Sequence, residues 1–288
     1  MTLHRINGIN LNVEQVGSGP SLVLLHGFTG SSATWTGHAE RFGERFTTYS
    51  IDLIGHGRTD APLDSQRYRM ERCVEDLVTL FDELGIESTA LLGYSLGARV
   101  ALHLVVAAPQ RIRSLILEGA SPGIADPSER AARAQTDAML AELIERDGLV
   151  AFVDRWQSQP LFGSEQQLPP EVRQRHRAQR LANDPRGLAN SLRGMGAGTM
   201  EPVWGQLHEI AIPVLLIAGE LDRKYVEIST LMARQMPGAS RLVIADAGHA
   251  PHLEAPAQFD RAVIEWFTGH INESSDGSFE SDRLPRPV

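Results

Sequence analysis

Apolar residues occur along this chain in two alternating patterns: short continuous runs, and longer runs with the spacing of a helix. A short run rich in β-branched residues predicts a buried strand, whereas apolar positions three or four residues apart predict a helix. Strands that are apolar on both faces and joined by helices are typical of a parallel sheet with right-handed crossovers. The expected strands are residues 21–25, 47–52, 90–92, 114–117, 213–218 and 241–244.

The beginning of the chain follows a different pattern, in which apolar and polar side chains alternate. Residues 2–6 and 9–16 both alternate in this way, and Asn7-Gly8 lies between them. Asn-Gly between two alternating segments is a strong short-range signal for a β-hairpin. We therefore expect an antiparallel pair of strands before the parallel sheet.

The alternation of strands and helices stops between residues 125 and 207, where helical patterns follow one another without a strand. This stretch comes just after the strand that ends near Glu118, at the edge of the sheet where loops build binding sites. We interpret it as a helical cap over a pocket, with residues 1–124 and 208–271 forming the core. The tail, residues 272–288, lacks periodicity and is expected to be disordered.

Composition limits the kinds of partner. With 288 residues and 42% hydrophobic content, the chain can build one large α/β core with an insertion. The net charge of -9 argues against a nucleic-acid partner, although the pocket for an anionic small molecule can still be basic. The single cysteine, Cys73, cannot form an internal disulfide and falls in the apolar stripe of a predicted helix, residues 70–84.

The sequence also lacks the features of a secretory signal and of a membrane span. The first residues lack a basic and then apolar signal, and no apolar run approaches the roughly 18 residues of a membrane span. We expect no membrane partner and a cytoplasmic location.

The chemistry is indicated by residues 93–97, in which Ser95 stands between Gly93 and Gly97. This is the pattern of a nucleophile elbow, a turn so sharp that the serine is strained and its hydroxyl is exposed above a sheet. Only glycine fits two residues to either side of such a serine. The context agrees, because the strand that ends at Leu92 precedes the motif and an apolar helix, residues 96–108, follows it.

A serine nucleophile needs a basic partner, and the base needs a carboxylate that orients it. In a fold of this kind the chain order is serine, acid, histidine. Asp222 and His249 follow successive late strands in that order. His252 is the reserve histidine, and Glu118, at the end of the strand after the elbow, is the alternative acid.

Two further features lie near the serine in sequence or in the expected fold. The backbone N–H groups of Phe28 and Leu96 are expected to form an oxyanion hole, and His26 to brace the loop that carries Phe28. Arg99 lies about one helical turn beyond Ser95, so a permanent cation shares a helix face with the reactive oxygen. This favours a carboxylated substrate over a simple ester.

These motifs together resemble the α/β-hydrolase superfamily across nearly the whole chain. Five segments are more narrowly similar to the 2-succinyl-6-hydroxy-2,4-cyclohexadiene-1-carboxylate synthases of menaquinone biosynthesis: residues 93–99, 118–123, 129–133, 156–162 and 219–224. The chain departs from that family at Ala98, where the family usually has a second glycine. This one-carbon difference leaves the assignment standing.

The resemblance implies a role for each matching residue. Ser95, Asp222 and His249 would form the triad, and Lys224, the only lysine in the chain, would stand at the mouth of the site. The carboxylates of the substrate would be bound by Arg99, Arg133 and Arg180, and the pocket would be lined by Tyr94, Trp156 and Phe162.

The reaction that the resemblance implies is the elimination of pyruvate from 2-succinyl-5-enolpyruvyl-6-hydroxy-3-cyclohexene-1-carboxylate, with the triad acting as base. It needs no metal and no cofactor. Two alternatives stay open: a serine esterase or carbon–carbon bond hydrolase that works through an acyl-enzyme, and a ligand receptor without catalysis. The sequence leaves open the oligomeric state and the choice between menaquinone and phylloquinone biosynthesis.

Overall fold

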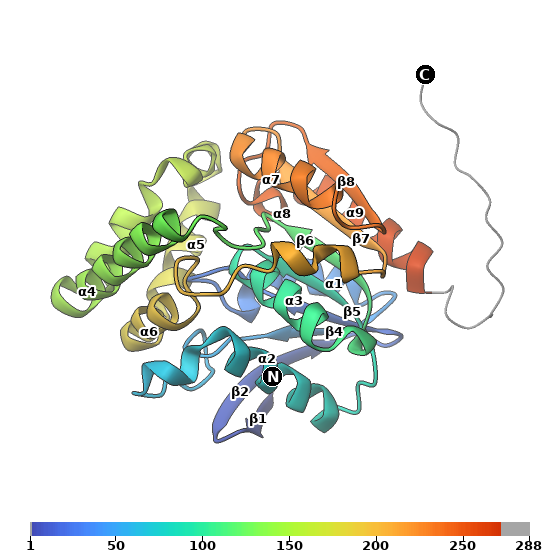
Figure 1. Cartoon of the computed structure of the whole chain (residues 1–288), viewed down its shortest axis with the longest axis horizontal. Helices are drawn as coiled ribbons and strands as arrows, with labels where there is room; N and C mark the ends of the chain where they lie inside the picture. Colours follow the sequence, from blue (N-terminus) through green and yellow to red (C-terminus); the bar gives the residue numbers. More distant parts are fainter. Residues whose placement is uncertain (1, 272–288) are drawn as a thin grey trace.

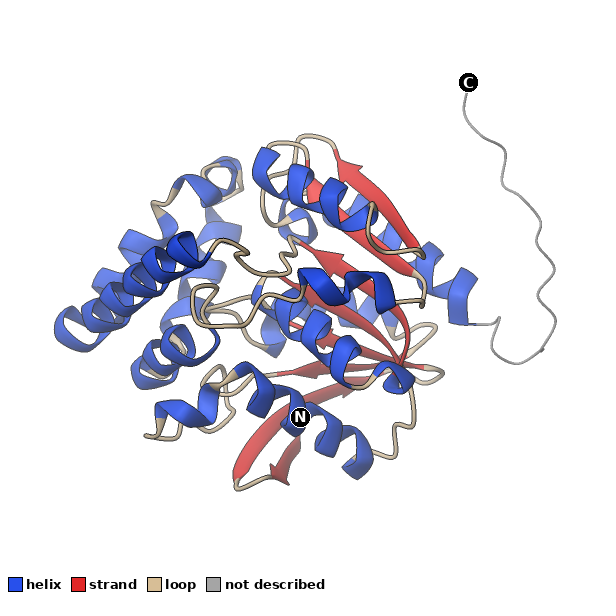
Figure 2. Ribbon diagram, viewed as in Figure 1, coloured by secondary structure: helices blue, strands red, loops and turns tan. Residues whose placement is uncertain are grey.

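The computed structural model describes residues 2–271, which form a central sheet with helices on both faces (Figures 1 and 2). The predicted tail, 272–288, lies outside the described residues. The strands are β1 (Thr2–Ile6), β2 (Ile9–Val16), β3 (Ser21–Leu25), β4 (Thr47–Ile51), β5 (Thr89–Tyr94), β6 (Ile112–Glu118), β7 (Val214–Gly219) and β8 (Ala239–Ile244). Within this part of the chain they make one eight-stranded sheet in the order β1-β2-β4-β3-β5-β6-β7-β8.

The sheet confirms the expected architecture. β2 pairs antiparallel with β1 and with β4, and every later pairing is parallel. The hairpin turn forms where predicted, with positive φ at Asn7 and Gly8. The expected later strands agree with the observed ones to within two residues at either end.

The helices cover the sheet in two layers. α2 (Met70–Glu83), α3 (Leu96–Ala107) and α7 (Arg223–Ala233) pack on one face, and α1 (Thr36–Phe42) and α9 (Pro256–Ile271) pack on the other. Successive strand residues point to opposite faces, so Leu25 joins the first core and Leu24 the second. No helix in residues 2–271 has the length and apolarity that a membrane span requires.

Only helices occur between β6 and β7, and those of residues 127–195 gather at one end of the sheet (Figure 2). They are α4 (Pro127–Gln157), α5 (Pro170–Leu181), α6 (Pro185–Met195) and short 3-10 turns that include η4 (Pro160–Phe162) and η5 (Ser164–Gln167). α4 is interrupted at Gly148, whose φ of 83° and ψ of 172° are not helical. Side chains of α4 and α6 share a small core of their own, against which Phe28 of the main fold packs.

The turn between β5 and α3 has the strained geometry that its motif predicts. Ser95 has φ 50° and ψ -103°, outside the regions that L-residues normally occupy. A Cβ on Gly97 would overlap the backbone oxygen of Leu25, and a Cβ on Gly93 would overlap the backbone of Gly97. Glycine is therefore required at both positions by close approach of the backbone, since neither has a positive φ.

This contact predicts the outcome of a pair of glycine substitutions. Gly97→Ala should lower the free energy of unfolding by about 1 to 3 kcal/mol or more, because the backbone of β3 must shift to admit the methyl group. Gly37→Ala is the matched control: Gly37 is exposed in α1, and a methyl group added there would have no atom within 4 Å, so stability should stay equal or rise. Urea denaturation of both variants checks this, and an unchanged Gly97→Ala protein would contradict it.

Candidate active site

Three side chains that follow separate strands meet at the carboxyl edge of the sheet. Ser95 Oγ lies 3.1 Å from Nε2 of His249, and Nδ1 of His249 lies 2.7 Å from Oδ2 of Asp222. With its proton on Nδ1, the imidazole donates to Asp222 and leaves Nε2 free to accept the proton of the serine hydroxyl. Asp222 also caps α7 by accepting the N–H of Tyr225 at 3.4 Å.

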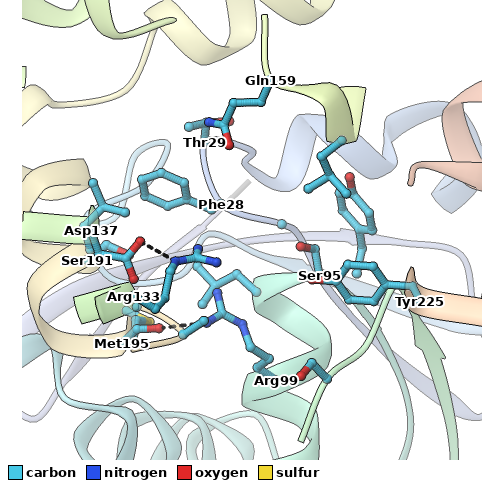
Figure 3. A pocket seen from close by; sticks show the side chains of 18 of the residues that line it. Phe28, Thr29, Ser95, Arg99, Arg133, Asp137, Gln159, Ser191, Met195 and Tyr225 are labelled. Atoms are coloured by element: carbon cyan, nitrogen blue, oxygen red, sulfur yellow. Dashed lines mark hydrogen bonds and ion pairs between the residues drawn. The ribbon is translucent and has the colours of Figure 1, made fainter. Parts of the chain in front are cut away.

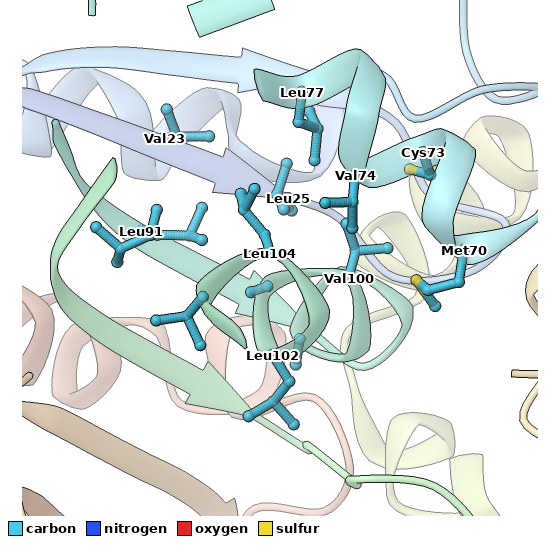
Figure 4. Close-up of a cluster of buried hydrophobic side chains, with 14 of the residues drawn as sticks. Val23, Leu25, Met70, Cys73, Val74, Leu77, Leu91, Val100, Leu102 and Leu104 are labelled. Carbon is cyan, nitrogen blue, oxygen red and sulfur yellow. The ribbon is translucent and has the colours of Figure 1, made fainter. Parts of the chain in front are cut away.

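Ser95 stands at the start of a helix that is buried in the core. α3 begins directly after Ser95, and its residues Val100 and Leu104 are fully buried among side chains of β3, β5 and α2 (Figure 4). Cys73 belongs to the same cluster, as predicted, and burial raises the pKa of its thiol. Ala98 is fully buried in α3.

The reserve histidine and the alternative acid pair with each other. Glu118 Oε1 accepts the backbone N–H of His252 at 2.9 Å, and both carboxyl oxygens lie 2.9 Å from its Nδ1. Burial raises the pKa of Glu118 to about 8 and lowers the pKa of His252 well below its ordinary value. The two groups are therefore mostly uncharged at neutral pH, and they form a second buried pair beside the first.

The loop after β3 stands opposite the start of α3. In the described part of the chain, neither the N–H of Phe28 nor that of Leu96 donates to another protein group. His26 Nδ1 lies 2.8 Å from the oxygen of Gly27, and its Nε2 accepts the N–H of Leu53 at 3.0 Å. His26 thus ties the loop to the residues after β4, as expected for a brace.

A cavity of about 540 Å³ opens over Ser95, between the strand ends and the helices of residues 125–207. Aromatic rings form much of its wall: Phe28 lies 5.2 Å from Trp156 and Trp156 lies 5.6 Å from Phe162, between ring centres. The predicted site residues that line it are Phe28, Tyr94, Ser95, Leu96, Arg99, Arg133, Trp156, Phe162, Arg180 and Lys224. Asp222 and His249 stand behind this wall.

Two of the cavity's arginines already have acidic partners. Arg133 donates from Nε to Asp137 at 2.8 Å. Arg180 is buried, pairs with Glu165 at 3.1 Å and stacks on the ring of Phe162, with its guanidinium carbon 5.3 Å from the ring centre. Their positive charge is therefore partly compensated within the protein.

Arg99 differs from both. Its Nη1 reaches the backbone oxygen of Met195 at 3.4 Å and the sulfur of Met200 at 3.6 Å, and it forms no ion pair with any carboxylate in residues 2–271. Burial lowers the pKa of its guanidinium to about 10, so the group is still a cation at neutral pH. Figure 3 shows Arg99 and Arg133 pointing into the same space, with Ser95 and Tyr225 across it.

Some cavity residues were not predicted from the sequence. Tyr225 is one: its ring centre lies 4.6 Å from that of His249, and burial raises the pKa of its hydroxyl. Its neighbour Lys224 is exposed, with Nζ 5.9 Å from the centre of the Tyr225 ring. Asp137 could have been found, because it follows Arg133 at the four-residue spacing of a helical ion pair.

No group of three or more metal-ligating side chains that could hold an ion occurs among the residues the structure describes. The side chains and backbone groups gathered at this site supply a hydroxyl, an imidazole, carboxylates, guanidinium groups and N–H donors.

Comparison with known proteins first shows the fold family to which the chain belongs. The model of the alpha/beta hydrolase fold family matches residues 20–256, so the chain belongs to that family. A solved structure, that of MenH from S. aureus, superimposes with a TM-score of 0.87 at 33% identity and covers 91% of this chain and 99% of its own.

Proteins similar to this chain in sequence indicate a narrower family within that fold. The putative 2-succinyl-6-hydroxy-2,4-cyclohexadiene-1-carboxylate synthase of Bacillus subtilis is 41% identical over 264 residues, which cover 91% of this chain and 96% of the relative. The synthase of the same name from Serratia proteamaculans is 30% identical over 83% of this chain and 90% of its own length. Within the alpha/beta hydrolase fold, the chain belongs with this synthase family.

The buried Glu118 predicts a pH dependence of stability. Its pKa is about 8 in the folded protein against an ordinary 4.5, so between these values the unfolded chain releases a proton that the native protein retains. This group therefore lowers the free energy of unfolding as pH rises from 5 to 8. Glu118→Gln keeps an acceptor for the N–H of His252 and cannot ionise.

The stability of Glu118→Gln relative to wild type should therefore rise with pH by about 1 kcal/mol per unit across this interval. Urea denaturation at pH 5, 6, 7 and 8 measures the difference. A difference that stays constant with pH would show that Glu118 is ionised in the native protein.

Proposed function

We propose that the protein is a lyase that eliminates pyruvate from 2-succinyl-5-enolpyruvyl-6-hydroxy-3-cyclohexene-1-carboxylate, giving 2-succinyl-6-hydroxy-2,4-cyclohexadiene-1-carboxylate. The observation that carries the proposal is Arg99, a cation that faces the cavity above Ser95 without a carboxylate partner in residues 2–271. An uncompensated charge in a partly dry pocket is costly unless a ligand supplies the anion. This substrate carries three carboxylates. Family membership supports the same reaction.

The triad would act as a base in this reaction. Ser95, activated by His249, takes the proton from the ring carbon that bears the succinyl group, next to its ketone. The electrons of that bond form a new ring double bond, the existing double bond shifts, and the carbon–oxygen bond to the enolpyruvyl group breaks. The leaving group takes a proton and becomes pyruvate. A separation of 3.1 Å between Ser95 Oγ and His249 Nε2 supports the initial proton transfer.

An enolate oxygen develops on the succinyl ketone during this step. We assign the N–H groups of Phe28 and Leu96 to bind it, because both line the cavity beside Ser95 and have no protein acceptor in the described residues. The reaction then uses side chains and backbone donors alone. We propose no metal or cofactor for it.

The three arginines would divide the substrate's carboxylates among them. Only Nη1 of Arg99 has hydrogen-bond partners in the described residues, so its other edge, Nε and Nη2, can bind a carboxylate in bidentate fashion. Arg133 donates only its Nε N–H to Asp137 in the described structure, so its Nη groups are available to a ligand. Arg180 shares its charge with Glu165 and so supplies a weaker third contact. Lys224, exposed at the cavity wall, would attract the substrate at the mouth.

We also propose that residues 125–207 act as a cap on a core formed by residues 1–124 and 208–271. The support is the division of the cavity wall: the helical segment contributes Arg133, Trp156, Phe162 and Arg180. The net charge of -9 supports a small-molecule substrate over a nucleic-acid partner. We propose a cytoplasmic location and no membrane partner.

The experiment that tests the proposed reaction is a coupled assay for pyruvate with the enolpyruvyl substrate. Ser95→Ala and His249→Ala should each lose most of the rate, and the double variant should lose little more, because the two residues share one step. Losses that add in free energy would contradict the triad. Hydrolysis of simple esters far faster than pyruvate release would instead identify an esterase that uses the same triad through an acyl-enzyme.

Substitution of Arg99 separates the lyase from an esterase. Arg99→Ala should lower kcat/KM for the enolpyruvyl substrate by an amount equivalent to about 2 to 4 kcal/mol, through loss of a charge-assisted bidentate pair. Arg99→Lys should recover only part of this, because an ammonium lacks the planar fork.

A small neutral ester provides the control, because it has no carboxylate for Arg99 to bind. Its turnover by both variants should stay close to that of wild type. Equal losses on the two substrates, or a large drop in Tm for Arg99→Ala, would assign Arg99 to the scaffold.

A further inference from the structure

The loop that carries His249 is held by the carboxylate of Glu254. Glu254 Oε2 accepts the N–H of Gly248 at 2.8 Å, and its Oε1 accepts the N–H of Ala250 at 3.2 Å. These two residues stand immediately before and after His249. One side chain therefore fixes the backbone on both sides of the histidine.

The short helix after His249 explains how Glu254 reaches back. α8 (Pro251–Glu254) begins after Ala250, which has no side chain that can cap the helix. The backbone N–H of Glu254 donates to the oxygen of Ala250 at 2.9 Å, which turns the side chain over the preceding loop. Glu254 is the fourth residue of α8, one position beyond the acid of a capping box, and its carboxylate likewise returns to the backbone N–H at the start of its own helix.

Nearby contacts leave the loop little freedom to find another acceptor. A Cβ on Gly248 would overlap Ser164 of η5, and a Cβ on Gly219 would overlap the oxygen of Gly248. Ala250 is only 1% exposed, so its N–H would lose its acceptor without gaining water if Glu254 were removed. The loop would have to move to satisfy it.

Movement of this loop would displace the imidazole of His249 relative to Ser95. The imidazole of His249 bridges Asp222 at 2.7 Å and Ser95 at 3.1 Å, and an error near 1 Å in such an arrangement costs on the order of 100-fold in rate. Glu254 does not line the cavity above Ser95 in the described structure. Glu254 therefore does not act by contact with a bound substrate, and its two backbone hydrogen bonds act through the loop that carries His249.

We propose that Glu254 is a positioning residue that holds His249 in line with Asp222 and Ser95 by accepting the two flanking backbone N–H groups. The inference rests on the proposed use of the triad and not on the identity of the substrate. Any electrophile that the serine attacks can report the geometry of Ser95 activation.

The test compares Glu254→Ala and Glu254→Gln with Asp184→Ala. Asp184 is a matched control, because its exposed carboxylate also accepts two backbone N–H groups, of Arg186 at 2.8 Å and Gly187 at 3.1 Å, at the start of α6. The readout is the second-order rate at which a neutral phosphonofluoridate labels Ser95, with Ser95→Ala as the blank. The low-field proton resonance of the His249–Asp222 hydrogen bond is recorded in parallel.

Glu254→Ala should label on the order of 10- to 100-fold more slowly than wild type, and its low-field resonance should shift or broaden. Glu254→Gln keeps one acceptor oxygen but turns an NH₂ group toward the second N–H, so it should be intermediate. For both, kcat for pyruvate release should fall while KM stays within about twofold, because Glu254 does not touch the cavity. Asp184→Ala should lose stability and label at the wild-type rate.

Labelling of Glu254→Ala at the wild-type rate, or a loss no larger than that of Asp184→Ala, would overturn the proposal. If Glu254→Ala does not fold, the Gln variant decides: wild-type labelling by folded Glu254→Gln overturns it equally. The reagent carries no carboxylate, so the proposed reaction is tested separately. A wild-type enzyme that is labelled but releases no pyruvate would refute the lyase and leave the role of Glu254 standing.

Discussion

The close approach of the elbow to β3 is the constraint on which the rest of the site depends. With no side chain at Gly93 or Gly97, the turn can lie against the backbone at Leu25, and Ser95 is forced to φ 50°. The same contact fixes the start of α3, and so places the N–H of Leu96 opposite the loop of Phe28 and directs Arg99 toward the cavity one turn later. One steric requirement thereby positions the serine, half of the proposed oxyanion hole and a cation.

The charges that line the cavity then favour an anionic substrate. Arg133 and Arg180 are held by Asp137 and Glu165, which orients their guanidinium groups and reduces their net charge. Arg99 has only a carbonyl oxygen and a sulfur as hydrogen-bond partners in the described residues, and burial lowers its pKa without removing its charge. A polyanionic substrate offsets the cost of that partly buried charge, whereas a neutral ester does not.

Much of this arrangement could be predicted from the sequence because it follows local rules. The Gly-x-Ser-x-Gly spacing determines the turn, and the order of strand ends places Asp222 and His249 beside Ser95. Contacts between distant segments could not be predicted in the same way. Glu118 and His252 are 134 residues apart and each was a candidate for the triad; only the packed structure shows that they pair with each other and that burial favours the uncharged form of both.

The same limit applies within the helical segment. The arginines of residues 125–207 are numerous, and helical spacing alone identifies Asp137 as a partner of Arg133 but not Glu165 as a partner of Arg180, fifteen residues away. Tyr225 was missed because a tyrosine at the start of a helix carries no sequence signal for a cavity. Glu254 has a local signal, five residues after His249, whose meaning appears only when both of its backbone hydrogen bonds are seen.

The central claim is that Arg99, which faces the cavity without a carboxylate partner in residues 2–271, binds a carboxylate of the substrate. Calorimetric titration of the Ser95→Ala protein with the enolpyruvyl substrate tests it most directly, because this variant keeps the cavity and cannot start the reaction. Addition of Arg99→Ala to the Ser95→Ala protein should weaken binding of the substrate at least about 10-fold, through loss of the charge-assisted pair. Equal affinity of the two proteins for the substrate would contradict it.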